Sequence, residues 1–189
     1  MAGLKNTEDQ LILEWVIGEL TMEKGFRALV EKYQQKLYWH IRRMVLVHED
    51  ADDVLQNTFI KVYKSIHQFE GKSSLFTWLY RIATNECLSF LDKNKRYKYD
   101  GMDEQSEHPV IQQLAADPYF EGNEIQLRLQ EALTRLPDKQ KQVFLLRYHD
   151  EMSYKEMSQV LETSEGALKA SYHHAVKKIE EYFKSLELI

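Results

Sequence analysis

Residues 153–178 read SYKEMSQVLETSEGALKASYHHAVKK, and this stretch decides the fold because it contains two helical segments separated by a short break. Apolar residues recur at helical spacing first at Met157, Val160 and Leu161 and then, after the break, at Leu168 and Tyr172. We expect the first group to pack against the second. Two helices joined by so short a turn have the outline of a helix-turn-helix motif.

The serines in this stretch predict where each of the two helices begins. Ser153 and Glu156 have the spacing of a capping box, and Ser164 can cap the second helix. A helix-turn-helix that binds DNA fits this pattern. An αα-hairpin with a solvated polar face fits it equally well, so the pattern alone leaves both interpretations open.

The exposed face of the second helix is polar and carries several cations. A serine at the start of a helix and lysines along its face suit phosphate contacts, because the first N–H groups of a helix are free to donate. The residues expected on this face are Glu165, Lys169, Ser171, His173, His174, Lys177 and Lys178.

The rest of the chain outside residues 99–124 also shows helical periodicity, and no segment alternates like a strand. The 7 glycines and 3 prolines are too few for a turn-rich β architecture. We therefore predict an all-α protein. Further helices are expected at about Met22–Val45, Asp50–Ile66, Leu75–Leu91 and Ile125–Arg135, with a short loop at 69–74.

Composition limits the classes of function that the chain can have. Its 189 residues include 25 Lys and Arg against 30 Asp and Glu, a formal charge of -5. This balance excludes a protein that binds nucleic acid by bulk charge alone, so any such role rests on local patches. We expect a soluble, cytoplasmic protein, because Cys87 is the single cysteine, no apolar run approaches the ~20 residues of a membrane helix, and the N-terminus is acidic.

Charge also divides the chain into three parts. Residues 99–124 contain 7 acids and no Lys or Arg, together with two prolines and two glycines. We interpret them as a flexible acidic linker, in which 110–116 can form a helical turn. The expected domains are therefore residues 1–98 and 125–189.

The predicted helix at 50–66 has two different faces. One carries a narrow apolar stripe that we expect to be buried: Val54, Leu55, Phe59, Val62 and Tyr63. The other presents Asp53, Gln56, Asn57, Ile60, Lys61 and Lys64. Such a mixed face is typical of an ordinary solvated surface and also suits docking to a partner helix.

The next helix repeats candidate DNA-binding side chains at spacings of three or four. Trp78, Arg81, Asn85 and Ser89 share the face opposite Leu79. Aromatic rings stack on unpaired bases, arginine binds phosphate, and an amide can read a base edge. Trp78 can instead be a core residue while Arg81 binds DNA, and Phe76 has the same alternative.

Blocks in both halves together resemble a known family. Residues 52–59 (DDVLQNTF), 69–74 (FEGKSS) and 77–85 (TWLYRIATN) resemble region two of the extracytoplasmic-function (ECF) sigma factors. Leu136-Pro137, 143–147 (VFLLR), 152–157 (MSYKEM) and 166–169 (GALK) resemble region four of the same family. The blocks occur in family order and cover about three quarters of the chain. The resemblance implies two helical domains that read a two-part promoter for RNA polymerase.

The resemblance also implies a role for particular residues. The residues matched to polymerase binding are Asp52, Asp53, Gln56, Asn57, Thr58 and Lys61. Those matched to the minus-ten element, including a pocket for a flipped base, are Lys72, Ser73, Ser74, Phe76, Trp78, Arg81, Asn85 and Ser89. Those matched to the minus-35 element are Ser164, Glu165, Lys169, Ala170, Ser171, His173, His174 and Lys177. Many relatives carry Arg where this chain has Ser171 and His174, so weaker or different base specificity is expected.

The expected partners also come from the resemblance. They are core RNA polymerase, through its β′ clamp helices and β flap, promoter DNA, and an anti-sigma protein that is often membrane-anchored. We expect a monomer without cofactor or metal. The sequence shows no phosphate-cradling glycine loop, HExxH motif or nucleophile elbow, so an enzyme is not expected.

Two other functions remain as alternatives. A stand-alone helix-turn-helix regulator would use residues 125–189 alone. A helical scaffold would not touch DNA at all.

Overall fold

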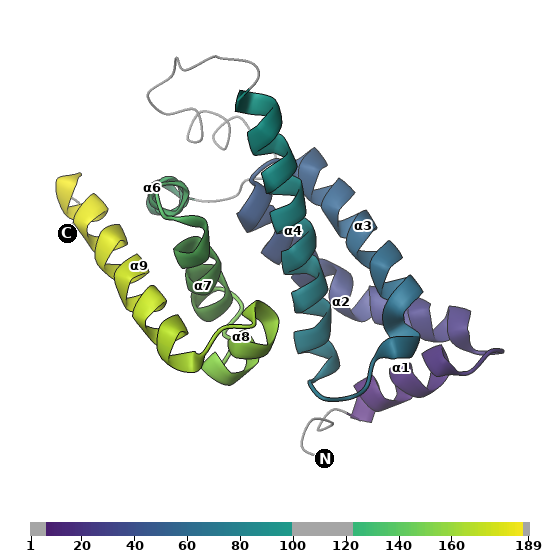
Figure 1. The fold of residues 1–189 in the computed structure, drawn as a ribbon. Helices are drawn as coiled ribbons and strands as arrows, with labels where there is room; N and C mark the ends of the chain where they lie inside the picture. Colours follow the sequence, from purple (N-terminus) through teal and green to yellow (C-terminus); the bar gives the residue numbers. More distant parts are fainter. Residues whose placement is uncertain (1–6, 100–122, 187–189) are drawn as a thin grey trace. The chain divides into compact units, whose positions relative to one another are not determined.

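The computed structural model describes residues 7–99 and 123–186, and every regular element in these two ranges is helical (Figure 1). The predicted all-α class is therefore confirmed. The first range contains α1 (Thr7–Ile17), α2 (Met22–Val45), α3 (His48–Ser65), the 3₁₀ turn η1 (Ile66–Gln68) and α4 (Leu75–Tyr99). The second contains α6 (Glu124–Thr134), α7 (Asp138–Tyr148), α8 (Tyr154–Leu161) and α9 (Glu165–Ser185).

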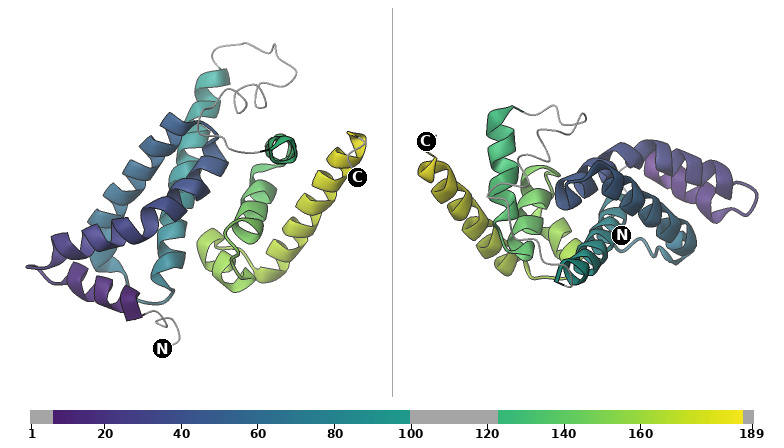
Figure 2. Two further views of the ribbon diagram at one scale, coloured as in Figure 1. Left: turned by 180° about the vertical axis from the view of Figure 1, so that it is seen from behind. Right: turned by 90° about the horizontal axis from the view of Figure 1, so that it is seen from above.

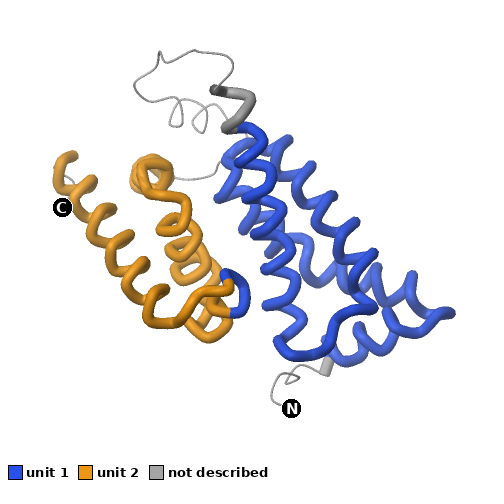
Figure 3. The backbone as a smooth tube through the Cα atoms, in the orientation of Figure 1, with its two compact units in different colours: residues 1–94, 159–161 blue, residues 95–158, 162–189 orange. Residues whose placement is uncertain are grey.

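The chain divides into two compact units (Figure 3). Unit 1 comprises residues 1–94 with 159–161, and unit 2 comprises residues 95–158 with 162–189. Most of the expected linker, including the helical turn expected at 110–116, lies outside the described residues. The domain limits at 98 and 125 stay a prediction.

Unit 1 is built on α2, which packs against both α1 and α3 (Figures 1 and 2). Leu29, Leu37 and Ile41 line its fully buried side, as the helical spacing requires. Gly25 lets α1 approach closely, because a Cβ at this position would lie 2.5 Å from the backbone nitrogen of Val16. The antiparallel pair of helices therefore buries its facing sides with no room for a larger residue at 25.

Two polar contacts hold unit 1 together from inside. The Tyr33 hydroxyl donates to Asp9 Oδ1 at 2.7 Å and joins α2 to α1. His40 Nε2 lies 3.0 Å from Thr84 Oγ1 and joins α2 to α4. Asp9, His40 and Thr84 are buried, so each needs such a partner to offset the loss of water.

The buried stripe of α3 differs from the prediction. Val54 and Val62 are buried as expected, with Ala51 and Thr58 completing the stripe. Tyr63 is 47% exposed, because its ring packs edge-on against Phe26 of α2 at the border of the core, with the ring centroids 5.0 Å apart. Leu55 and Phe59 are only half-buried.

Unit 2 packs α6 and α7 against the long helix α9. The buried side chains Leu133, Leu145 and Leu146 come from α6 and α7. Leu168 and Ala175 are the residues of α9 that are fully covered. Lys169, His173 and Lys177 of α9 are exposed, which leaves one side of this helix available to a partner.

Candidate nucleic-acid interface

The predicted helix-turn-helix is present in unit 2. Ser153 accepts a hydrogen bond from the Glu156 N–H, and the Glu156 carboxylate accepts from the Ser153 N–H at 2.9 Å, which completes the predicted capping box of α8. Glu162 ends α8 in a left-handed conformation (φ 50°, ψ 40°), and Ser164 caps α9 by accepting from the Ala167 N–H at 3.4 Å. The turn between the helices is therefore the short one that the sequence predicts.

The packing of the second helix differs in one residue from the expectation. Met157 and Leu168 are both buried, as expected for the two apolar pairs. Tyr172, however, stacks on Phe144 of α7, with the ring centroids 5.9 Å apart and the planes 16° from parallel. Phe144 also stacks on Tyr148 within α7 at 5.1 Å, so its ring joins a stack inside α7 to the contact with α9.

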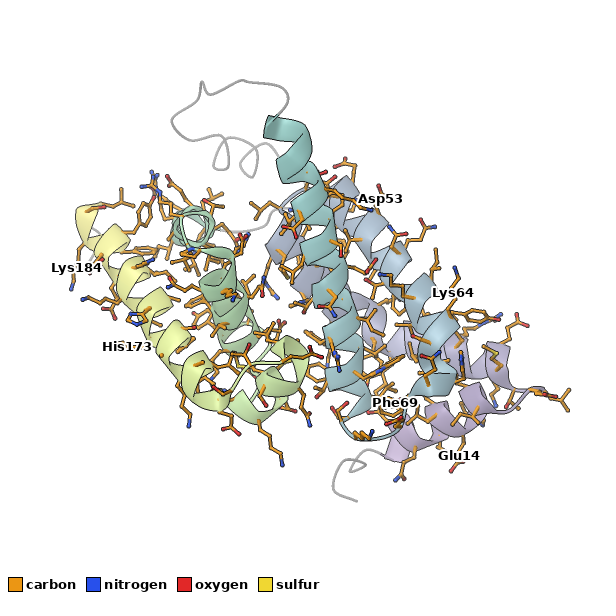
Figure 4. The ribbon with its side chains drawn as sticks, in the orientation of Figure 1. Glu14, Asp53, Lys64, Phe69, His173 and Lys184 are labelled. Atoms are coloured by element: carbon orange, nitrogen blue, oxygen red, sulfur yellow. The ribbon has the colours of Figure 1, made fainter. Side chains whose placement is uncertain are left out.

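The outward face of α9 presents most of the residues matched to the minus-35 element. Seven of the eight lie along one continuous helix, and Ser164 is its cap. Ser171 is half-buried, and the exposed ones are Ser164, Glu165, Lys169, Ala170, His173, His174 and Lys177. His173 is labelled on the outer side of α9 in Figure 4.

Two residues beside this face were not predicted. Lys169 Nζ lies over the ring of Tyr154, 5.5 Å from its centroid, and the Arg147 guanidinium lies 5.4 Å from the same centroid. Arg147 also donates to the Met152 carbonyl at 2.8 Å, which anchors its side chain. Tyr154 directly follows the helix cap Ser153. Its two cations come from α7 and α9, so no local sequence pattern predicts that they meet at this ring.

The outer face of α3 carries five of the six residues matched to polymerase binding. The exposed ones are Asp52, Asp53, Gln56, Asn57 and Lys61. Figure 4 labels Asp53 and Lys64 on this helix. The face is therefore largely polar along α3, with Ile60 as an exposed apolar residue on it.

Thr58 does not lie on that face, in contrast to its expected role in polymerase binding. Its side chain is completely buried, and its hydroxyl donates to the Val54 carbonyl at 2.8 Å. A threonine can be buried in a helix in this way because its hydroxyl is satisfied one turn earlier. Thr58 thus contributes to the core of unit 1.

Contacts with neighbouring side chains hold Asp52 and Lys61 of α3 in place. Asp52 Oδ2 lies 3.5 Å from His48 Nε2, and the other ring nitrogen of His48 lies 2.8 Å from the Tyr38 hydroxyl. Lys61 pairs with Glu86 of α4. These contacts orient charged groups of the face before any partner arrives.

The loop at 69–74 contains three of the predicted minus-ten residues. Gly71 adopts φ 69°, a left-handed conformation that turns the chain toward α4. Lys72 pairs with Glu70, and this hydrogen bond lowers the pKa of the Glu70 carboxyl. Ser74 caps α4 by accepting from the Thr77 N–H at 3.1 Å, and Ser73 donates to the Ser74 carbonyl at 3.2 Å.

Four of the other predicted minus-ten residues lie on the outer face of α4. Arg81, Asn85 and Ser89 are exposed. Trp78 is half-buried, with its ring centroid 5.4 Å from that of Phe69. The tryptophan therefore packs against the loop on one side and remains open on the other.

Phe76 is not brought together with these residues. Nine positions separate Phe76 from Asn85, which places them about 180° apart around the helix. The Phe76 ring lies against Tyr80, with centroids 4.3 Å apart, and Tyr80 in turn contacts His40 of α2. A base-binding pocket that includes both Phe76 and Asn85 is thus incompatible with this helix.

The described ranges contain neither a candidate membrane span nor a candidate metal-binding cluster. No helix there combines the length and hydrophobicity needed to cross a membrane. No group of three or more His, Cys, Asp or Glu side chains in those ranges is arranged to hold a metal ion.

Comparison with known proteins assigns both units to one family. Residues 29–97 match the family model of sigma-70 region 2, and residues 126–179 match that of sigma-70 region 4. The first match spans α2 to α4, and the second spans the helix-turn-helix.

Curated relatives extend over nearly the whole chain. The ECF RNA polymerase sigma-E factor of Haemophilus influenzae is 30% identical over 185 residues, which cover 94% of this chain and 96% of the relative. The ECF RNA polymerase sigma factor SigW of Bacillus subtilis is 29% identical over 171 residues, which cover 87% of this chain and 91% of the relative.

Solved structures share the fold. The sigma factor RpoE in complex with the anti-sigma factor NepR from Bartonella quintana aligns with a TM-score of 0.68 at 23% identity, covering 85% of this chain and 98% of that one. CnrH in complex with the cytosolic domain of CnrY aligns with a TM-score of 0.70 at 21% identity, covering 94% and 98%. Together with the two region matches and the 30% identical relative, the fold shows that this chain belongs to the ECF sigma factors of the sigma-70 family.

Proposed function

We propose that this sigma factor divides its work among three helical faces: α3 docks on core RNA polymerase, α4 binds the melted minus-ten element, and α9 reads the minus-35 element. The observation that carries the proposal is that each of these helices buries one side in its unit and exposes the matched polar side. The polymerase performs the chemistry, and the sigma factor supplies recognition and strand capture.

For docking, the α3 face offers carboxylates and amides to the β′ clamp helices. Asp53 and Gln56 lie near its centre and are exposed. Lys61 is held by Glu86, so its position is set before docking. Polar groups already oriented in the free protein lose less entropy when a partner binds.

For the minus-ten element, α4 offers one stacking surface, one cation and one amide within two helical turns. Trp78 has an open side on which an unpaired base can stack, and Arg81 can bind the adjacent phosphate. Asn85 can read a base edge. Extruding a base costs a few kcal/mol, which such stacking and hydrogen bonding can offset.

For the minus-35 element, α9 enters the major groove with Lys169 and His173 toward the bases. Lysine can donate to guanine O6 and N7, and histidine to a base or phosphate. The Tyr154 ring beneath Lys169 limits the freedom of that side chain. With Ser171 and His174 in place of arginines, fewer fixed charges face the DNA, so binding by α9 alone is weak.

An anti-sigma protein completes the proposed set of partners. One structural neighbour described above was solved in complex with the anti-sigma factor NepR, and the other in complex with the cytosolic domain of CnrY. We expect a cognate inhibitor, membrane-anchored in keeping with many relatives, to hold this monomeric sigma factor inactive in the cytoplasm.

Run-off transcription tests the proposal. Core polymerase with and without this protein transcribes a pool of genomic fragments, and the expected result is a set of discrete new start sites that require the protein. Asn85→Ala should abolish them, whereas Gln34→Ala removes an exposed amide from α2 and should not. Asp53→Ala should reduce polymerase binding itself. A failure of the wild-type protein to bind polymerase would refute the docking role.

Footprinting of the free protein adds a second test. Because the chain carries a net charge of -5, we expect no specific nanomolar complex with promoter DNA at physiological salt without polymerase. A specific footprint by the free protein would instead favour a stand-alone regulator. Lys169→Glu should weaken transcription from promoters that need the upstream element.

A further inference from the structure

A basic and aromatic surface lies on α2, outside the residues matched to DNA or polymerase. Lys36, Trp39 and Arg43 follow one another at spacings of three and four, so they share one face of the helix. Trp39 is 42% exposed, and its ring is met edge-on by Tyr38 with centroids 5.3 Å apart. We call these three residues the α2 ridge.

The charge around the α2 ridge is unlike that of the chain as a whole. From residue 32 to residue 47 the sequence has four Lys and Arg and no Asp or Glu. On the neighbouring helix, residues 75–85 include Arg81 and again no acid. A protein with a net charge of -5 thus has two adjoining helical stretches without a single carboxylate.

The contacts between α2 and α4 show which sides of the two helices adjoin. His40 contacts both Tyr80 and Thr84, and Tyr80 also donates to the Lys36 carbonyl at 3.4 Å. Later residues of α2 therefore meet later residues of α4, so the two helices cross with the same sense. Figure 1 shows this crossing: α4 runs upward, and α2 runs from the right toward the upper left.

Helical geometry then places the α2 ridge beside the DNA-binding face of α4. Arg81 lies about 100° beyond Tyr80 around α4, and Trp39 lies about 100° before His40 around α2. For two right-handed helices packed with the same sense, these two sides border the same groove. Arg81 and Asn85 thus face the same side of unit 1 as Trp39 and Lys36.

We infer that the α2 ridge extends the minus-ten surface and binds melted single-stranded promoter DNA next to the bases held by α4, with Trp39 stacking on a base and Lys36 and Arg43 contacting phosphates. Charge complementarity carries the choice of occupant, since an exposed indole between two cations, on helical stretches (32–47 and 75–85) that contain no Asp or Glu, fits a polyanion with unpaired bases. The inference rests on the proposed function of α4.

The test uses the full chain bound to core polymerase and a labelled forked DNA. The probe carries the promoter mapped by run-off transcription, with its minus-ten region single-stranded and without the upstream element. Trp39→Ala should weaken binding about tenfold, within the range for one base–aromatic stack, and Trp39→Phe should restore most of it. Lys36→Ala should lower the salt dependence of log K by about 0.7, the value for one phosphate on a single strand.

Controls separate this inference from the function on which it rests. Tyr148→Ala removes an exposed aromatic ring from unit 2 and should leave binding to this probe unchanged. Thermal melting of each variant verifies folding. Affinities of Trp39→Ala and Lys36→Ala within twofold of wild type, while Asn85→Ala binds poorly, would overturn the inference alone. If Trp39→Ala or Lys36→Ala weakened association with polymerase, the α2 ridge would belong to a protein partner, and the inference would also be overturned. If the wild-type protein gave no new start sites, the proposed function itself would be refuted.

Discussion

Replacing Glu131 with alanine should release the end of α9 from α6. Glu131 is buried, with 3% of its surface exposed, and its carboxylate accepts hydrogen bonds from the Tyr182 hydroxyl and from Arg135 at 2.8 Å. Arg128 approaches the same carboxylate at 3.4 Å. Tyr182 comes from α9 and both arginines come from α6, so one buried acid joins the two helices.

The size of the effect follows from the exposure of each partner. A hydrogen bond to a charged group contributes about 1.5 kcal/mol, and this value suits the half-buried Tyr182. The Arg135 side chain is 55% exposed, so solvent screening reduces its ion pair to about 0.5 kcal/mol. The variant Glu131→Ala should therefore destabilise unit 2 by about 2 kcal/mol, which is roughly 10 °C in melting temperature for a domain of this size.

Amide hydrogen exchange locates the change within the chain. A loss of about 2 kcal/mol corresponds to roughly 30-fold faster exchange in the last turns of α9, near Tyr182. Residues of α2 in unit 1 should keep their protection. Glu124→Ala serves as the matched control, because it removes an exposed acid from α6 that lies 3.7 Å from Arg128.

The result that would refute this reasoning is equally specific. If Glu131→Ala and Glu124→Ala exchanged at the same rate near Tyr182, the buried carboxylate would contribute nothing to the α6–α9 contact. A double-mutant cycle with Tyr182→Phe tests the pairing directly, since the two losses should not add when the residues interact. Full additivity would contradict the contact.

Three further predictions follow from single contacts. Ser153→Ala removes the cap of α8 and should lower the unfolding free energy of unit 2 by about 1 kcal/mol, measured by urea titration. Gly25→Ala places a Cβ 2.5 Å from the Val16 nitrogen and should cost about 2–3 kcal/mol in the same assay, with Gly166→Ala, where the Cβ meets nothing within 4 Å, as control. Burial, and then the hydrogen bond to Asp9, raise the pKa of Tyr33 above its usual 10.0. Above about pH 10 the folded chain therefore keeps a phenol proton that the unfolded chain loses, so the unfolding free energy of unit 1 should fall as pH rises further. The same urea titration on Tyr33→Phe should show a smaller fall.

The helices were predictable where local signals coincide. The expected limits of α2, at Met22 and Val45, are those observed. The caps at Ser153 and Ser164 were also confirmed, because a capping box involves residues only three apart in sequence. Local periodicity and capping therefore set the position of most helix starts in the described ranges.

Contacts between distant residues were not predictable in this way. Tyr182 and Glu131 are 51 positions apart, and neither lies in a motif. The burial of Thr58 was missed because a hydroxyl side chain is polar. In the structure this hydroxyl donates to the Val54 carbonyl within α3, so it can be buried. Tyr63 was expected inside because an aromatic ring counts as apolar, yet its place at the border of the core leaves it exposed.

The two serine caps show why residue type alone cannot separate a structural role from a DNA-binding one. Ser164 accepts a hydrogen bond from the Ala167 N–H, which uses an oxygen lone pair, but its own O–H proton remains a donor. The cap also holds the serine beside the free N–H groups of the first turn of α9, where a phosphate is favoured. Stability and phosphate contact therefore select the same residue at this position, and the two roles reinforce each other. Thr58 is the opposite case: its hydroxyl donates to a carbonyl inside α3, and its burial leaves no surface for a partner.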